Sequence, residues 1–549
     1  MPSSYDAVVI GAGHNGLTCG CYLARAGLKV LVLEQYSDIG GMTISEEIAA
    51  PGFLSDIHAS GYLVAKLTPA PQELGLAERG LELITPDPNW AQVYPDGKVL
   101  AIGRDLETTV RSFAQFSAKD GETWRALYRN YLAAKPAITA GMNTVPPSLA
   151  AEFVGPSAIG EYRFQFQSVR SWADQTFESP EIRNFFACCA LHACLSPDDA
   201  LGAEFAWLFA CAVQDVGVSV VKGGMHNVSR ALASVLRSHG GEVRAGAGVA
   251  EIVCENGRAT AVRLAGGERI AVDGVVASNV DPRHFALDLL GERTLGPAIT
   301  EKIKRYEWGS SFFVIYAALD RPVAYRAGAA ADSAGYVHAA GQTLDDLAET
   351  FAQCRAGLLP SAPMVGIINE AAMDPTRAPE GRGLMKFVLH YVPYRVTGDA
   401  RGKIAGTDWD QIKDAYADTM IDYMSEPFPP GLRDRIIARS VQSPVDLERR
   451  IRSAVHGTHQ HGAYLPYQIG AMRPIQCGIR YLRRSRPCLP VTAANAAHTS
   501  PARGGGYRLR TLTPPGSAFG RATLPIKGRD GNCCARSALA VLPVLNPRP

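Results

Sequence analysis

The chain has 549 residues, of which 47% are hydrophobic and 20% charged, as is ordinary for a globular protein with more than one hydrophobic core. The formal net charge is +2, so nothing in the overall composition favours a nucleic-acid partner. The 12 cysteines include no C-x-x-C pair, which argues against a disulfide reductase and against a structural zinc site.

The first forty residues predict a strand, a glycine-rich turn, a helix and a second strand. The apolar run 7–10 is typical of a buried parallel strand. Residues 29–34 predict the second strand, and Gly27 is typical of the C-terminal cap of the helix between them. The residues expected on the buried face of that helix are Leu17, Gly20, Cys21 and Ala24.

The turn has the pattern G-x-G-x-x-G, which predicts a dinucleotide site. Gly11 permits the tight turn, Gly13 lets a pyrophosphate approach the helix N-terminus, and Gly16 allows close packing of helix and strand. Glu34 follows Gly16 by 18 residues, where a carboxylate can accept hydrogen bonds from an adenosine ribose. We therefore expect a bound dinucleotide.

Three features favour FAD over a nicotinamide dinucleotide. The motif begins the chain, and Gly40-Gly41 follows Glu34 closely, which allows a second backbone approach to the cofactor. We find no second complete glycine motif, because residues 246–251 have only two of the three glycines. An acid at position 34 also disfavours NADP, whose ribose carries a phosphate.

The remaining elements predict a return to the nucleotide sheet and two inserts. Residues 226–236 predict an amphipathic helix, and residues 112–219 show helical periodicity with many aromatic side chains. Residues 310–319 and 385–392 predict strands. The inward side of the first helix comprises Val228, Leu232, Val235 and Leu236. A further helix over 408–424 is expected to bury Trp409, Ile412, Ala415 and Met420.

Residues 5–41, "YDAVVIGAGHNGLTCGCYLARAGLKVLVLEQYSDIGG", resemble the N-terminus of the phytoene desaturase-like FAD-dependent oxidoreductases. This family includes carotene desaturases, desaturase-type carotene ketolases and the group called pyridine nucleotide-disulfide oxidoreductase domain-containing protein 2. The resemblance continues in "GFLSDIHASG", "VKGGMHNVSRALASVLRSHGGEV", "ASNVDP" and "HGAYLPYQIGAMRP". It covers roughly residues 4–475, and its N-terminal motif is the most specific part.

The resemblance implies an α/β fold, in which a doubly wound, Rossmann-type FAD-binding domain contains an inserted α+β substrate domain. Residues 1–105 and 221–300 are expected to form the FAD-binding domain, 106–220 a helical insert and 301–460 the substrate domain. Residues 461–475 are expected to return to the FAD site, and 476–549 form an atypical basic tail that we expect to be irregular.

The predicted cofactor-binding residues combine the glycine motifs with their neighbours. They are Gly11, Gly13, His14, Asn15, Gly16, Glu34, Gln35, Gly40, Gly41, Met42 and Val249. The resemblance places His58, Tyr464 and Arg473 near the flavin or the substrate, although each is equally interpretable as a buried polar group with its hydrogen bonds satisfied. Cys188, Cys189 and Cys194 lie beside His192 in sequence, and we interpret them as small core residues and expect no metal.

Family likeness ends at Ile475, just before the segment that closes the FAD site in related proteins. The stretch 476–549 has 12 Lys and Arg residues against one acidic residue and lacks apolar periodicity. Two interpretations stay open: a shifted reading frame, and a basic tail that contacts membranes or acidic partners.

The sequence thus predicts an FAD-dependent oxidoreductase that removes hydride from an apolar, isoprenoid, carotenoid or lipid-like small molecule. The alternative is a flavin-binding regulatory or interaction protein without turnover. No apolar stretch is long enough and free of charge to predict a membrane span. We expect a cytoplasmic protein and leave peripheral association with a membrane open.

Overall fold

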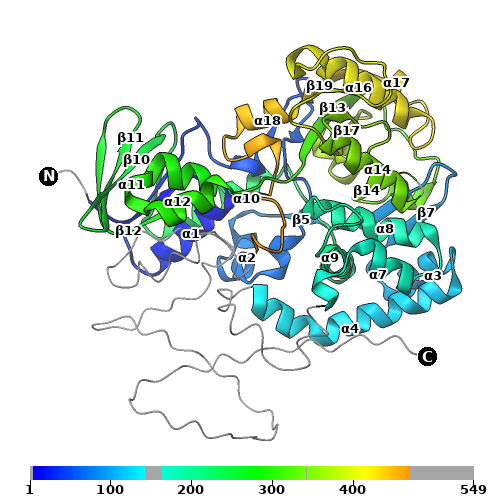
Figure 1. The fold of residues 1–549 in the computed structure, drawn as a ribbon, viewed down its shortest axis with the longest axis horizontal. Helices are drawn as coiled ribbons and strands as arrows, with labels where there is room; N and C mark the ends of the chain where they lie inside the picture. Colours follow the sequence, from blue (N-terminus) through cyan, green and yellow to red (C-terminus); the bar gives the residue numbers. More distant parts are fainter. Residues whose placement is uncertain (1–3, 143–162, 340, 342, 461, 470–549) are drawn as a thin grey trace, which may run out of the picture.

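The computed structural model describes residues 4–142, 163–339, 341, 343–460 and 462–469. Two large sheets organise this part of the chain, and the unit built on each can be followed in Figure 1. The smaller unit contains the N-terminal strand, and the larger unit contains α16 and β19.

Six strands form the first sheet in the order β10-β11-β12-β1-β2-β9. The central strand β1 pairs in parallel with β2 and β12, and β2 pairs in parallel with β9. The other two strands are antiparallel additions at one edge. The bounds are β1 Tyr5–Ile10, β2 Val30–Leu33, β9 Glu242–Arg244, β10 Val249–Glu255, β11 Arg258–Leu264 and β12 Arg269–Ser278.

Helices cover both faces of this sheet, which is the doubly wound arrangement that the sequence predicts. On one face lie α1 (His14–Arg25) and α10 (His226–Ser238), which pack against each other. A Cβ added to Gly20 would lie 3.0 Å from Cγ2 of Val32, so the missing side chain lets α1 approach β2 closely. On the other face lie η5 (His284–Leu290), α11 (Glu292–Leu295) and α12 (Pro297–Lys304).

The inward faces predicted for these two helices are confirmed. The four residues predicted for the N-terminal helix are buried, and Gly27 has a φ of +86° just after the helix end. The four predicted residues of α10 are at most 6% exposed. Their apolar side chains form one core with the inner face of β1 and β2.

Seven strands form the second sheet in the order β19-β13-β17-β16-β14-β6-β7. The strands predicted at 310–319 and 385–392 are confirmed as β13 and β17, which pair antiparallel. The bounds are β6 Trp90–Val93, β7 Val99–Ile102, β13 Ser311–Leu319, β14 Tyr336–Ala339, β16 Val365–Asn369, β17 Gly383–Val392 and β19 Ile436–Gln442.

The second sheet separates two different environments. Because side chains alternate along a strand, Phe313 and Phe387 point to one face, where they pack in one core with Trp409 of α16 (Trp409–Ser425). The opposite face bears Tyr316 and Lys386, which reach the segment of the FAD-type unit around residue 57. This opposite face therefore joins the two units.

Helices of the insert pack against the far end of that opposite face. Trp90 and Tyr336 of the sheet belong to the same core as Trp172 and Phe186 of the helices. Cys188, in the middle of this core, is fully buried, and burial raises the pKa of its thiol above the ordinary value. The helices are α4 Ala118–Met142, α7 Val169–Thr176, α8 Pro180–Ala190 and α9 Gly202–Val216.

Two expectations differ from the structure. Ala415 is exposed, because the inward stripe of α16 runs through Tyr416 and Ala417 instead. Second, β6 and β7 lie within the predicted first FAD segment 1–105, but β6 pairs in parallel with β14. Strand pairing therefore assigns residues 90–102 to the seven-stranded sheet.

Shorter elements connect the two units. Short strands are β3 Ser45–Glu46, β4 Ser55–Asp56, β5 Leu83–Ile84, β8 Val220–Val221, β15 Leu358–Leu359 and β18 Gly398–Asp399. The remaining helices are α2 Ala70–Glu73, α3 Leu106–Ala114, α13 Ala329–Asp332, α14 Leu344–Arg355, α15 Glu370–Met373, α17 Leu432–Arg435 and α18 Pro444–Arg450. Single helical turns are η1 Gly41–Thr43, η2 Val64–Leu67, η3 Ala77–Arg79, η4 Leu191–Ala193, η6 Pro375–Arg377 and η7 Val455–Gly457.

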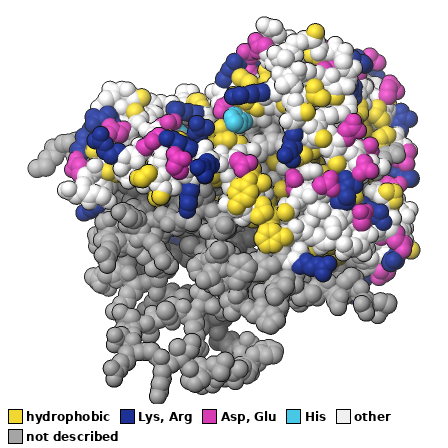
Figure 2. All heavy atoms as spheres, in the orientation of Figure 1, with side chains coloured by type: hydrophobic (Ala, Val, Ile, Leu, Met, Phe, Trp, Pro, Cys, Tyr) yellow, Lys and Arg dark blue, Asp and Glu magenta, His cyan; other side chains and the backbone are white. Residues whose placement is uncertain are grey.

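The surface mixes both signs of charge. Figure 2 shows Lys and Arg interspersed with Asp and Glu over the described part of one face, with hydrophobic side chains gathered between the two units. Within the described residues, no helix is both long and apolar enough to cross a bilayer.

Candidate FAD-binding and active site

The glycine-rich turn leaves the carboxyl end of β1 and leads directly into α1. Gly11 has a φ of +95°, which L side chains rarely adopt. A Cβ on Gly16 would lie 2.0 Å from the carbonyl oxygen of Gly11, so only glycine permits this packing. Gly13 is the N-cap of α1 and offers no side chain to its first N–H groups, which leaves them available to an anion.

Glu34 lies directly after β2, beside the turn. Its carboxylate accepts hydrogen bonds from the backbone N–H of Ala12 at 2.8 Å and of Tyr36 at 3.2 Å. Burial raises the pKa of this carboxyl, and the bond from Ala12 opposes the rise. A carboxylate has about four acceptor positions, so Glu34 retains acceptor capacity for a ribose hydroxyl.

The second glycine pair lies against the first. Gly40 has a φ of +131° and donates its N–H to the carbonyl of Ala12 at 3.0 Å. Gly41 has a φ of +56°, and a Cβ there would lie 3.3 Å from Cα of Gly13. The two glycine segments thus form a cradle of backbone that side chains would fill. Met42 follows, and its carbonyl accepts from Ala59 at 3.0 Å.

Other predicted cofactor residues surround this cradle. His14 and Asn15 lie half-buried in the first turn of α1. Gln35 lies next to Gly248, where an added Cβ would be 3.3 Å from Cβ of Gln35. Val249 is the first residue of β10 and follows that glycine directly. The predicted residues therefore lie around the same edge of the six-stranded sheet.

Asn279 was not predicted as a site residue, although it lies over the glycine turn. Its N–H donates to the carbonyl of Ile10 at 2.8 Å, and its Nδ2 is 3.1 Å from the position of a Cβ on Gly13. The signal was present in "ASNVDP", since Asn279 directly follows β12, the parallel neighbour of β1. Ligands bind outside the carboxyl ends of such strands.

These features fit an adenine dinucleotide. The uncapped N-terminus of α1 suits a pyrophosphate, the cradle admits close backbone approach, and Glu34 suits a ribose. We propose Gly11, Gly13 and Gly16 with Glu34 as the principal binding groups, and the other predicted residues as their surroundings.

The three weaker candidates lie in different surroundings. Burial, Lys386 and Arg450 lower the pKa of His58 well below its ordinary value, so the imidazole is neutral. Its Nε2 has no hydrogen-bond partner among the described residues. Tyr464 packs edge-on against Phe205 of α9, with ring centroids 5.7 Å apart. Arg473 lies outside the described residues.

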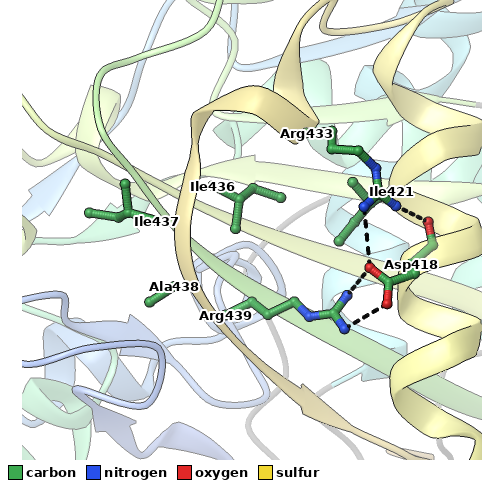
Figure 3. A pocket seen from close by; sticks show the side chains of 7 residues that line it. All are labelled: Asp418, Ile421, Arg433, Ile436, Ile437, Ala438 and Arg439. Carbon is green, nitrogen blue, oxygen red and sulfur yellow. Dashed lines mark hydrogen bonds and ion pairs between the residues drawn. The ribbon is translucent and has the colours of Figure 1, made fainter.

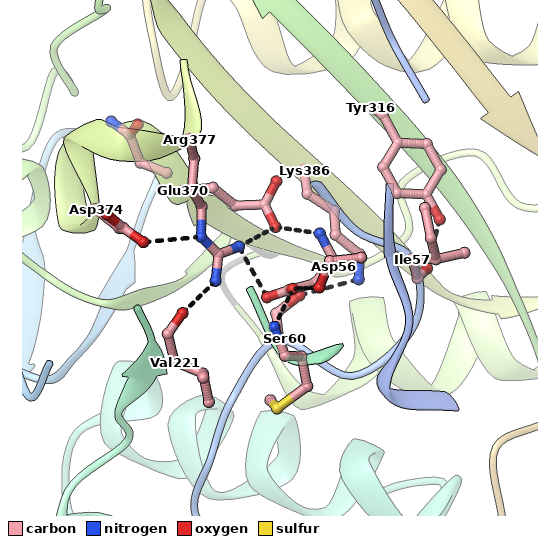
Figure 4. A network of polar contacts seen from close by, with 12 residues as sticks. Asp56, Ile57, Ser60, Val221, Tyr316, Glu370, Asp374, Arg377 and Lys386 are labelled. Atoms are coloured by element: carbon pink, nitrogen blue, oxygen red, sulfur yellow. Dashed lines mark hydrogen bonds and ion pairs between the residues drawn. The ribbon is translucent and has the colours of Figure 1, made fainter. Parts of the chain in front are cut away.

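A buried network of charged groups, absent from the sequence predictions, lies next to His58 (Figure 4). Arg377 pairs with Asp56 at 2.9 Å and with Glu370 at 3.2 Å, and all three side chains are 1% exposed. Asp374 adds a third carboxylate at 3.4 Å. Burial, followed by the neighbouring Asp56, raises the pKa of Glu370 to about 7.

Lys386 of β17 completes this network on the side of the seven-stranded sheet. Its ammonium donates to the carbonyl of His58 at 2.6 Å and to the hydroxyl of Ser60 at 3.0 Å. Burial lowers its pKa to about 8. The segment 55–60 is held in turn on η1, because Ile57 donates to the carbonyl of Ile44 at 2.9 Å. The network therefore fixes the sheet against the segment that follows the glycine cradle.

A separate open cavity of about 320 Å³ lies between α16 and β19 (Figure 3). Its charged groups pair with one another, since Asp418 accepts from both Arg433 and Arg439. The cavity lies beside α16, which covers the face of the sheet opposite to Lys386. It is therefore separate from the glycine cradle.

Comparison with known proteins decides the family. The family model described as flavin containing amine oxidoreductase matches residues 16–421. The chain belongs to this family. It is an FAD-dependent oxidoreductase, and the prediction of FAD as its cofactor is confirmed.

Relatives of this flavoprotein confirm the phytoene desaturase-like resemblance. Pyridine nucleotide-disulfide oxidoreductase domain-containing protein 2 of Rattus norvegicus is 29% identical over 86% of this chain and 87% of its own. One of the proteins that make up the limonene dehydrogenase of Castellaniella defragrans is 28% identical over 86% and 88%. A lycopene-forming phytoene desaturase of a Paracoccus species is 26% identical over 83% and 87%.

The fold is that of FAD-dependent oxidases. The structure of putrescine oxidase bound to putrescine superposes with a TM-score of 0.54, at 16% identity, and the match covers 88% of this chain and all of that one. This similarity confirms the predicted α/β, Rossmann-type fold class.

Proposed function

We propose that this flavoprotein removes hydride from a C–H bond of an apolar, isoprenoid- or lipid-like substrate. Two of the similar proteins are named for limonene and for phytoene, and both of these compounds are hydrocarbons. The likeness supports the same class of substrate here.

The observation that carries this proposal is the aromatic lining where the sheet meets the helical insert. Trp90 stacks on Tyr336 with centroids 4.5 Å apart, and its edge meets Phe209 at 5.5 Å. Phe209 in turn lies 6.0 Å from Phe205, which contacts Tyr464. Ligand sites for apolar molecules are lined in this way, with few polar groups.

Each part of the chain then has a distinct task. When bound, FAD supplies the hydride-accepting ring. The glycine cradle and Glu34 bind and orient the dinucleotide. Lys386 and Arg377 position the segment 55–60 between cradle and sheet. The aromatic side chains exclude water and hold the substrate.

Product analysis tests this proposal. The FAD-loaded protein should be incubated with a panel of terpenes and polyenes and with oxygen or a soluble quinone as electron acceptor. A product two hydrogens lighter than its substrate, identified by mass spectrometry, is expected. Stable FAD binding with no product from any member of the panel would favour the alternative, a flavin-binding regulatory or interaction protein.

A further inference from the structure

Three histidines from separate elements meet on the face of the seven-stranded sheet that joins the helical insert. His338 lies on β14, His390 on β17 and His192 on η4. The Nε2 atoms of His192 and His338 are 2.9 Å apart, and the ring of His390 lies 5.4 Å from that of His192. The cluster has no part in the FAD site described above.

The cluster has unused hydrogen-bonding capacity. Among the described residues, neither ring nitrogen of His390 has a hydrogen-bond partner, and Nδ1 of His338 has none. His338 is fully buried and His390 is 3% exposed. Unpaired polar atoms in such surroundings reduce stability, so native structures keep few of them without a purpose.

Aromatic rings enclose the cluster. Trp90 meets His338 edge-on at 4.4 Å, Phe209 stacks on His192 at 4.5 Å, and Phe312 meets His390 at 4.9 Å. The nitrogens are therefore the polar groups of an otherwise apolar site, which is how small-molecule sites fix the orientation of a ligand.

The backbone beside the cluster is also strained. Phe312 pairs with His390 and Ser311 with Val392, so Tyr391 is an extra residue that forms a bulge in β17. Tyr391 has a φ of +59°, and Cys194, two residues after His192, has a φ of +54°. Bulges re-aim side chains and, like such strained residues, are over-represented at functional sites.

The charges around the cluster define the ligand. Burial and the neighbouring imidazoles of His192 and His390 lower the pKa of His338 well below its ordinary value, and the same causes act on His390 with His459. The rings are therefore neutral, and each offers one donor and one acceptor. A cationic amine would lack a counter-charge here, and an anion would lack a cation, within the described residues. An uncharged oxygen group suits both the donors and the acceptors.

We propose that His338 and His390 bind a hydroxyl or carbonyl oxygen on an otherwise apolar substrate. This inference rests on the proposed function and specifies its substrate class. His390 follows Lys386 by four residues on the same face of β17, about 13 Å along the strand. A substrate of terpenoid length therefore reaches from the segment near the FAD cradle to the cluster.

Binding, rather than turnover, tests this inference. Geraniol and geranial should be compared with 2,6-dimethyl-2,6-octadiene, which has the same skeleton without oxygen, and with geranylamine. Anaerobic equilibrium dialysis against the FAD-loaded protein measures each affinity. We expect geraniol or geranial to bind at least about tenfold more tightly than the hydrocarbon and the amine.

Variants separate a binding role from a structural one. His390→Phe should bring the affinity for the oxygenated probes to that for the hydrocarbon. It should not lower Tm, because it removes unpaired buried nitrogens. His390→Gln, which retains a donor and an acceptor, should keep part of the preference. The control His239→Phe, at an exposed position, should bind all four probes like the unaltered protein.

Three results would overturn the inference. The first is equal affinity for geraniol, geranial and the hydrocarbon in the unaltered protein. The second is a lowered Tm in His390→Phe with its preference intact. The third is a rise of Tm with Zn²⁺ that His390→Phe abolishes. None of them bears on the proposed function, which fails only if no apolar compound is oxidised.

Discussion

The ammonium of Lys386 donates a hydrogen bond of 2.6 Å to the carbonyl oxygen of His58. This bond joins the middle of the seven-stranded sheet to the segment that follows the FAD cradle. Both groups are buried away from water, so the contact depends on the charged network around it. The stability of that network is therefore the first property to test.

Removing the cation of that network should destabilise the whole protein. Arg377→Met leaves Asp56 and Glu370 buried without their shared partner. The loss expected for an uncompensated buried charge is about 3–5 kcal/mol in the free energy of unfolding. Urea denaturation measures it. The matched control is Lys222→Met, since Lys222 pairs with Glu82 at the surface and should cost at most about 1 kcal/mol. Equal losses in the two variants would contradict the account.

Glu370 should give stability a specific dependence on pH. Its folded-state pKa is raised from 4.5 to about 7, so its contribution is fully present below pH 4.5 and is lost as the pH rises through 7. Glu370→Gln remains uncharged throughout. The stability of Glu370→Gln relative to the unaltered protein should therefore increase between pH 5 and 8, as followed by urea midpoints. A constant difference over that range would show that Glu370 does not titrate there.

Glu34 should contribute to FAD affinity without contributing much to the fold. Glu34→Ala removes one charged acceptor, which is worth about 1.5–3 kcal/mol. The dissociation constant of FAD should rise roughly ten- to a hundredfold. Fluorescence titration of the FAD-free protein with FAD measures it, and Glu82→Ala, at an exposed position, is the control. Unchanged affinity in Glu34→Ala would remove Glu34 from the site.

Gly13 should tolerate no branched side chain when FAD is bound. Gly13→Val places a Cβ 3.1 Å from Nδ2 of Asn279 and adds two methyl groups where the pyrophosphate approaches. FAD should be lost on gel filtration while circular dichroism shows the fold retained. The control Gly266→Val has open space around its Cβ and should retain FAD. A Gly13→Val protein that elutes with a full complement of FAD would contradict the proposed cradle.

The sequence predicts the local parts of this site well. The turn at Gly11, the helix after it and Glu34 lie within 30 residues, so their geometry follows from spacing and from the conformational freedom of glycine. The charged network could not be predicted in this way, because Asp56 and Arg377 are 321 residues apart. Only the pairing of β17 with β13 and β16 brings Lys386 to His58.

The same limitation explains the other differences. Ala415 fits an apolar list for α16, but a helical turn of 3.6 residues takes the inward stripe through Trp409, Ile412, Tyr416 and Met420. The histidine cluster draws one residue from each of three elements that are distant in sequence. Its members show no shared motif, so only the fold brings them together.

Anaerobic single-turnover spectroscopy tests the central claim most directly. The FAD-loaded protein is mixed with each apolar compound in the absence of any other electron acceptor, and the visible absorbance band of the oxidised flavin is followed. The account predicts that the band bleaches with at least one isoprenoid or lipid-like compound and returns when oxygen or a quinone is admitted. A band that bleaches with dithionite but with no apolar compound would contradict it.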